Sequence, residues 1–197
     1  MTAGPVDTAA GPADAADEAE LVAELRDDPA RFAAVYDRYF RVIYRYIAGR
    51  LGPQHADDLA AETFLVAYAK RDRFDPARGA LRPWLFGIAT NIVRHHRRVE
   101  ARRYQALARV PVEVAAEGPE DRAVDIAAAG RLRPRLARAL RSLPTRERDV
   151  LLLVTLGGLT YDEVGQSLGI PAGTAGSRLS RARAKLRTAF DQETNHG

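Results

Sequence analysis

Wherever this chain shows an apolar pattern, the apolar residues recur every three or four positions, and no segment alternates as a strand would. One such stripe predicts a long helix that Gly52-Pro53 ends. A second helix is expected from about 56 to 69, and a third begins near Pro83 and carries Trp84 and Ile88 inward. The chain is therefore predicted to be all-α. The residues of the first stripe are Phe32, Val35, Tyr36, Tyr39, Ile43, Ile47 and Leu51.

The helical pattern falls into two blocks. It is lost between 104 and 126, where Pro111, Gly118 and Pro119 stand among several acidic residues, which is typical of a flexible acidic linker. The sequence therefore predicts two helical domains, flanked by a disordered Ala-, Gly-, Pro- and Asp-rich tail and a short C-terminal tail. The predicted ranges are 1–16 for the tail, 17–103 and 127–190 for the domains, 104–126 for the linker and 191–197 for the end.

Composition narrows the function classes. A formal charge of +4 and a pI near 9.7 permit binding to nucleic acid, an acidic protein or an anionic membrane. The absence of cysteine excludes disulfides and thiolate zinc sites, and adjacent His95 and His96 point different ways around a helix, so neither a metal nor a cofactor is expected. No signal peptide or long apolar run is seen, so we expect a cytoplasmic protein without membrane insertion. No phosphate loop or nucleophile elbow suggests an enzyme.

The last third of the chain has the pattern of a helix–turn–helix unit. Thr145 is expected to cap one helix, and Thr160 with Glu163 forms a capping box for a short helix that ends at Gly169. A longer helix then runs from about 172 to 190, with an apolar stripe on one side and small and basic residues on the other. Such a helix can enter the major groove of DNA, although a basic solvated face would have the same pattern. The stripe is Ala175, Leu179, Ala182, Leu186 and Phe190, and the opposite face carries Ser177, Arg178, Ser180, Arg181, Arg183, Ala184, Lys185 and Arg187.

The stretch LRSLPTRERDVLLLVTLGGLTYDEVGQSLGIPAGTAGSRLSRARAKLR resembles domain 4 of sigma factors of the extracytoplasmic-function group. The G-T, S-R and R-A-R ending carries most of the resemblance. It implies that the last helix reads the minus-35 promoter element. Two residues depart from the family pattern, since a β-branched residue usually stands at Ala175 and often a basic one at Gly176. A glycine within a helix costs about 1 kcal/mol relative to alanine. The implied DNA-binding residues are Ser177, Arg178, Ser180, Arg181, Arg183 and Lys185.

The segments ADDLAAETF (56–64) and RPWLFGIATNIVRHHRR (82–98) resemble sigma domain 2. The first implies docking on the β′ clamp helices of RNA polymerase through Asp58, Leu59, Glu62 and Phe64. Ala61 replaces the family's usual glutamine, and a plain solvated helix face remains the alternative.

The second segment implies recognition and melting of the minus-10 element. A base must leave the stack before its Watson–Crick edge can be read, and single-strand binding combines basic with aromatic groups. Asn91 could also merely brace the neighbouring loop. The implied minus-10 residues are Phe74 in the loop 73–81 together with Asn91, Arg94, Arg97 and Arg98.

The resemblance covers roughly 18–188 and implies a sigma factor that directs promoter-specific initiation of a stress- or signal-responsive regulon. The implied partners are core RNA polymerase, through its β′ clamp helices and β flap, and promoter DNA, both duplex and melted single strand. An anti-sigma factor is a further candidate partner. The family's linker threads into the polymerase cleft, whereas the sequence alone favours a simple tether. The alternative function is a stand-alone helix–turn–helix regulator that binds duplex DNA as a dimer.

Overall fold

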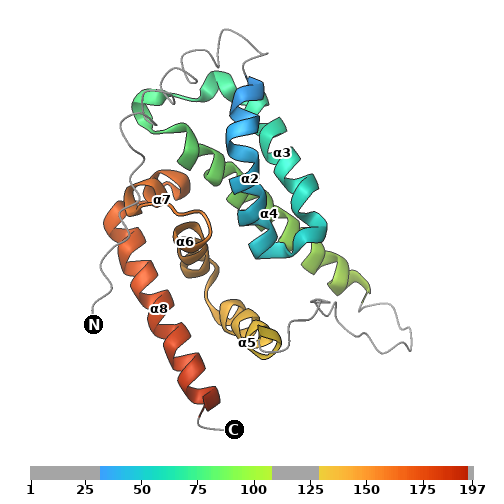
Figure 1. Ribbon diagram of the computed structural model, residues 1–197, viewed down its shortest axis with the longest axis vertical. Coiled ribbons are helices and arrows are strands. Elements are labelled where there is room, and N and C mark those ends of the chain that lie inside the picture. Colours follow the sequence, from blue (N-terminus) through green and yellow to red (C-terminus); the bar gives the residue numbers. More distant parts are fainter. Residues whose placement is uncertain (1–31, 108–128, 195–197) are drawn as a thin grey trace.

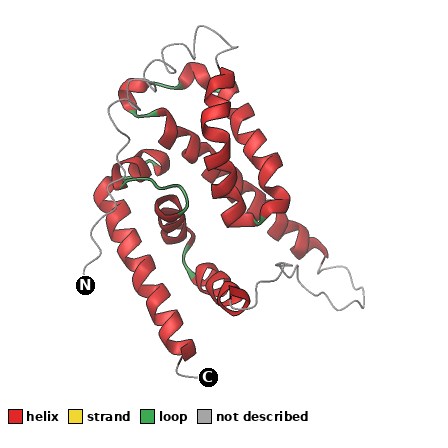
Figure 2. Ribbon diagram, in the orientation of Figure 1, coloured by secondary structure: helices red, strands yellow, loops and turns green. Residues whose placement is uncertain are grey.

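The computed structural model of the protein describes residues 32–107 and 129–194 (Figure 1). Within these two ranges the regular elements are helices, and no strand is present (Figure 2). The all-α prediction is confirmed for this part of the chain. The predicted tail 1–16 and most of the predicted linker lie outside the described residues. Helix α4 continues to Leu107, four residues into the segment that the sequence assigned to the linker.

The first domain is a bundle of three helices. They are α2 (Phe32–Leu51), α3 (Ala56–Ala69) and α4 (Leu81–Leu107), joined by 3₁₀ turns at Pro53–His55, Arg71–Arg73 and Pro76–Arg78. Helix α2 ends where Gly52 adopts a φ of 85°, a conformation that favours glycine. The bounds of α2 and α3 agree with the sequence prediction because their apolar stripes are long and regular. Tyr46, Ile43 and Phe86 are fully buried at the centre.

The second domain contains α5 (Ala129–Ser142), α6 (Thr145–Thr155), α7 (Tyr161–Leu168) and α8 (Ala172–Thr194). The predicted capping box is confirmed: Thr160 Oγ1 accepts from the Glu163 amide, and the Glu163 carboxylate accepts from the Thr160 amide at 2.8 Å. Gly169 ends α7 in the left-handed conformation, which turns the chain toward α8. The predicted cap at Thr145 is wrong: Pro144 occupies the cap position, and Thr145 is the first residue of α6.

The two domains pack against each other in a single body (Figure 1). Helix α7 lies on α4, and α6 lies near the end of α2. Buried residues of both domains form one continuous apolar core, in which Phe86 of the first domain and Leu153 of the second are both fully buried. The helix–turn–helix unit is thereby held against the first domain.

Candidate nucleic-acid and polymerase interfaces

The outer face of α8 carries the residues predicted to read the minus-35 element. Ala175, Leu179 and Ala182 are buried against the rest of the second domain, as the stripe predicted. Because this face of α8 is buried, the predicted DNA-binding residues on the opposite face point toward solvent. Ser177, Ser180, Arg181, Arg183 and Lys185 are exposed, and Arg178 is half-buried. The structure therefore brings the six residues together on one accessible helical surface, as a recognition helix requires.

One buried acid lies behind this surface. Glu147 of α6 accepts a hydrogen bond from Lys185 Nζ at 2.8 Å, and its other oxygen lies 3.5 Å from Arg181 Nε. The carboxylate is only 11% exposed, while Arg181 is 56% exposed. Glu147 therefore orients two predicted DNA-binding cations and partly neutralises them. Sequence analysis did not single it out.

The predicted minus-10 residues on α4 have two different environments. Asn91 and Arg98 are exposed, although the Asn91 side-chain oxygen lies 3.4 Å from Arg94 Nη1. Arg94 and Arg97 are half-buried and engaged with other residues of the protein. Only part of the predicted strand-binding face is therefore open to solvent.

The side chain of Phe74 is buried. It is 4% exposed and packs its ring 5.0 Å from that of Trp84, so in this structure its ring is buried, and its role in minus-10 binding stays a prediction. Trp84 itself was predicted to be core and is half-buried. The contact between these two tilted rings holds the loop 73–81 against α4, which gives Phe74 a structural role.

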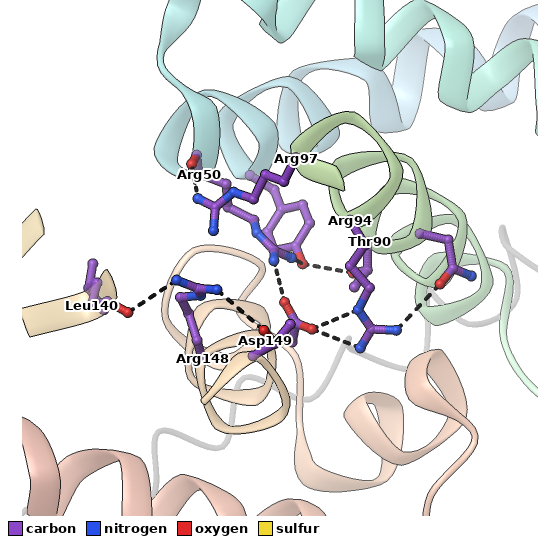
Figure 3. Close-up of polar contacts among 10 residues, drawn as sticks. Arg50, Thr90, Arg94, Arg97, Leu140, Arg148 and Asp149 are labelled. Atoms are coloured by element: carbon purple, nitrogen blue, oxygen red, sulfur yellow. Dashed lines mark hydrogen bonds and ion pairs between the residues drawn. The ribbon is translucent and has the colours of Figure 1, made fainter. Parts of the chain in front are cut away.

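Asp149 of α6 joins the two domains by contacting the last turn of α2 and the middle of α4 (Figure 3). Its side chain is fully buried, and both of its oxygens are bound by the first domain. Arg50 Nη2 donates to Oδ1, and Arg94 donates to Oδ2 from Nε and Nη2, each at 2.7 Å. Arg50 also donates to the Tyr46 hydroxyl, which lies 2.7 Å from the Thr90 hydroxyl. A chain of polar contacts thus runs from the core of the first domain to Asp149.

Further arginines surround this ion pair. Arg97 Nη2 donates to the backbone carbonyl of Arg50, and Arg148 reaches the Leu140 carbonyl from the next helix (Figure 3). Burial and the neighbouring charges of Arg148 and Arg50 lower the pKa of Arg97 to about 10. Burial and the charge of Arg50 also lower the pKa of Arg148. The cluster therefore holds more positive charge than its one carboxylate balances.

The predicted polymerase-docking helix α3 divides into an exposed and a buried set. Asp58 and Glu62 are exposed, whereas Leu59 and Phe64 are 8% and 3% exposed. The Phe64 ring packs 5.0 Å from that of Tyr36, so the structure places it in the core of the first domain. Leu65, which sequence analysis did not name, is 70% exposed on the same side as Glu62. The surface available to a partner is therefore acidic with one exposed leucine.

Metal ligands and membrane-spanning helices are the two other features that bear on function. Residues 32–107 and 129–194 contain no cluster of three or more histidines, cysteines or acids able to hold a metal ion. His96 instead packs its ring 4.8 Å from that of His55. No helix in these ranges has the length and apolar character needed to cross a bilayer.

Sequence analysis did not name Arg50 or Asp149, although the sequence contains a pattern that points to each of them. Arg50 falls three residues after Ile47 on the apolar stripe of α2, and Asp149 directly precedes the buried run from Val150 to Leu153. A charged residue on an apolar stripe must be paired when the stripe is buried. The sequence could therefore have flagged both residues, but not their pairing across 99 positions.

Two helical domains, the second a helix–turn–helix with an exposed basic helix, are the architecture of a DNA-binding protein. Comparison with known proteins identifies the family. Residues 34–103 match the family "Sigma-70 region 2", and residues 133–186 match "Sigma-70, region 4". The ECF RNA polymerase sigma factor SigW of Bacillus subtilis is 32% identical over 82% of this chain and 90% of its own. SigE of Mycolicibacterium smegmatis, also named an ECF RNA polymerase sigma factor, is 36% identical over 77% of this chain and 56% of its own.

Solved structures show the same architecture. CnrH in complex with the cytosolic domain of CnrY has a TM-score of 0.63 and 26% identity, over 89% of this chain and 97% of that one. The sigma factor RpoE in complex with the anti-sigma factor NepR from Bartonella quintana has a TM-score of 0.59 and 25% identity, over 81% and 96%. The chain belongs to the extracytoplasmic-function RNA polymerase sigma factors. This family acts in transcription initiation and is not known for enzymatic activity.

Proposed function

We propose that this chain binds core RNA polymerase and directs promoter-specific initiation of a stress- or signal-responsive set of genes. The proposal depends mainly on one observation: the same chain carries two basic helices, α4 in the first domain and α8 in the second. A stand-alone regulator needs only the duplex-reading helix. Two readers on two domains suit a promoter with two elements.

The exposed residues of α8 bind the minus-35 duplex. Arg181 donates to the acceptor edge of a guanine, which its planar guanidinium fits, while Arg183 and Lys185 bind phosphates. Ser177 and Ser180 are short enough to let the helix backbone lie close to the groove floor. Arg178, at the edge of the surface, adds a phosphate contact.

The face of α4 binds the melted minus-10 strand. The Asn91 amide can donate and accept, which suits the edge of an extruded base. Arg94, Arg97 and Arg98 bind the phosphates beside it. Phe74 supports this face from below by fixing the loop 73–81 on Trp84.

Polymerase binding begins on α3. Asp58 and Glu62 contact the β′ clamp helices, with Leu65 as an apolar anchor beside them, while Leu59 and Phe64 hold the helix in place from the core. The second domain contacts the β flap. An anti-sigma factor is a further partner, and the cytoplasm, where polymerase and promoter DNA meet, is the compartment. The chain catalyses no reaction of its own and needs no cofactor.

Binding to core polymerase without DNA tests the docking surface. Wild-type chain is expected to co-elute with core enzyme in gel filtration, and Asp58→Arg with Glu62→Arg is expected to abolish co-elution. The matched control is Asp162→Arg with Asp191→Arg, which changes two exposed acids of the second domain and the same net charge. Co-elution of the α3 variant at the wild-type level would show that the docking surface is misassigned.

A further inference from the structure

The structure brings together two histidines that lie far apart in the sequence. His55 stands at the cap position before α3, and His96 lies within α4; their ring centres are 4.8 Å apart. Sequence analysis compared His96 only with its neighbour His95, which points another way around the same helix. The chain has four histidines and no cysteine, so imidazole is its main ligand type for transition metals.

The distance between the two rings fits a shared metal ion. A divalent transition metal lies about 2.1 Å from an imidazole nitrogen and therefore about 3.2 Å from the centre of the ring. Two imidazoles on one ion, at an angle between about 90° and 109°, place their ring centres about 4.5–5.2 Å apart. The separation of 4.8 Å between His55 and His96 falls inside this range.

The tilt between the rings also permits a shared ion. The lone pair of an imidazole nitrogen lies in the plane of its ring, so an ion bound by two imidazoles must lie in both ring planes. Parallel stacked rings have no such common line. The planes of His55 and His96 cross at 51°, so a line common to both planes exists.

Both imidazoles are held in place and are free to bind. His55 ends the 3₁₀ turn that begins at Pro53, and its side chain makes no capping hydrogen bond to α3. Both side chains are half-buried, so an ion can reach them from solvent. Within residues 32–107 and 129–194, neither ring takes part in a hydrogen bond or an ion pair. Their nitrogens are therefore available as ligands.

Carboxylates near the pair moderate the charge that an ion would meet. Asp58 follows His55 by three residues, and Glu100 follows His96 by four, so each lies within about one helical turn of a histidine. Their charges oppose those of Arg97 and of the α3 N-terminus. Among the described residues neither acid joins the pair in a cluster of three ligands. Water must therefore complete the coordination shell.

From this geometry we infer that His55 and His96 form a site for one divalent transition-metal ion that prefers imidazole, such as Zn²⁺, Ni²⁺ or Cu²⁺. The ion joins the start of α3 to α4 and stabilises the packing of these two helices, which are in direct contact. The inference goes beyond the proposed function and does not depend on it, because binding can be measured on the free chain without polymerase or DNA.

Calorimetric titration of the full, untagged chain with Ni²⁺ tests the site. The wild-type chain is expected to bind one ion. His55→Gln and His96→Gln should each weaken binding at least tenfold, because one imidazole cannot chelate. His95→Gln changes the exposed neighbour of His96 and is the matched control, which should bind as wild type. Wild-type affinity in the folded His55→Gln and His96→Gln chains would overturn the inference.

Thermal unfolding separates metal binding from simple packing of the two rings. Ni²⁺ at about 100 times its dissociation constant should raise the melting temperature of the wild-type chain by roughly 5 °C. The same ion should leave the melting temperature of His96→Gln unchanged, whatever that substitution does without metal. An equal response of the wild-type and His96→Gln chains to Ni²⁺ would contradict the site.

Chemical modification of the wild-type chain decides the question even if the variants fail to fold. Diethyl pyrocarbonate modifies free imidazoles, and mass spectrometry reports the extent at each histidine. Ni²⁺ is expected to slow modification of His55 and His96 at least fivefold and to leave His95 and His196 unaffected. His196 lies outside the described residues. Equal protection of all four histidines, or protection of none, would overturn the inference.

Discussion

The two helices proposed to bind DNA, α4 and α8, differ in how many of their DNA-binding side chains are exposed. The proposed readers on α8 stand free of the protein core, with Ser177, Ser180 and Arg181 exposed. On α4, Arg94 is bound to Asp149, and Arg97 is bound to the Arg50 carbonyl. The duplex-reading surface is thus open to solvent, whereas on the strand-reading surface Asn91 and Arg98 are exposed and Arg94 and Arg97 are bound by other residues of the protein. The difference suits the order of events at a promoter, where duplex recognition precedes melting.

The first prediction separates the proposed function of α4 from that of α8. Asn91→Ala should lower open-complex formation about tenfold, equivalent to about 1.4 kcal/mol, because the extruded base loses its reading amide. Binding to polymerase and to the upstream element should be unchanged. Permanganate footprinting of the downstream element reports the melted bases directly.

Gln54→Ala, an exposed amide away from α4, is the control for this experiment. Normal melting by a folded Asn91→Ala chain would leave Asn91 only its contact with Arg94, 3.4 Å away.

The second prediction distinguishes base reading from phosphate binding on α8. Arg181→Ala should weaken binding to the matched upstream element by about 1–3 kcal/mol and lose discrimination at one base pair. Arg187→Ala should weaken binding uniformly across sequences. A binding series over all single-base variants of the element measures both. Equal losses on every variant for Arg181→Ala would exclude it as a base reader.

The third prediction concerns the acid behind α8. Glu147→Gln should raise affinity for any duplex by about threefold, near 0.7 kcal/mol, because Lys185 and Arg181 lose a competing carboxylate. The slope of log affinity against log salt should steepen by about one. Glu62→Gln on the first domain is the matched control. An unchanged slope would indicate that Glu147 does not compete with DNA for these cations.

The last prediction concerns the stability of α7, which supports α8 and packs on α4. Thr160→Ala removes half of the capping box and should destabilise the protein by about 1 kcal/mol. Thermal unfolding measures the loss, with Thr188→Ala on the exposed face of α8 as the control. A loss equal to that of the control would mean that the cap contributes nothing to the stability of α7.

Local pattern was enough to predict much of the fold. Helices α2 and α3 have the predicted bounds because regular apolar spacing and Gly52-Pro53 specify them within a few residues. The capping box and Gly169 were readable because their chemistry is local. Thr145 was misread because a threonine before a helical stripe can be either the cap or the first residue, and here Pro144 takes the cap.

Tertiary packing determined what the pattern could not. Phe64 was predicted to contact polymerase and Phe74 to contact DNA, and the sequence did not show that each would be buried against an aromatic ring of another segment. The pairing of Arg50 with Asp149 joins residues 99 positions apart, and no period in the sequence encodes such a distance. The exposed face of α8 was predictable because a helix that packs through one stripe must present the opposite residues to solvent.

Run-off transcription tests the central claim most directly. Core RNA polymerase is incubated with genomic fragments, with and without this chain. We expect discrete transcripts that depend on the wild-type chain and disappear with Asp58→Arg and Glu62→Arg. The same transcripts with and without the wild-type chain, at concentrations where it is folded, would contradict its function as an initiating sigma factor.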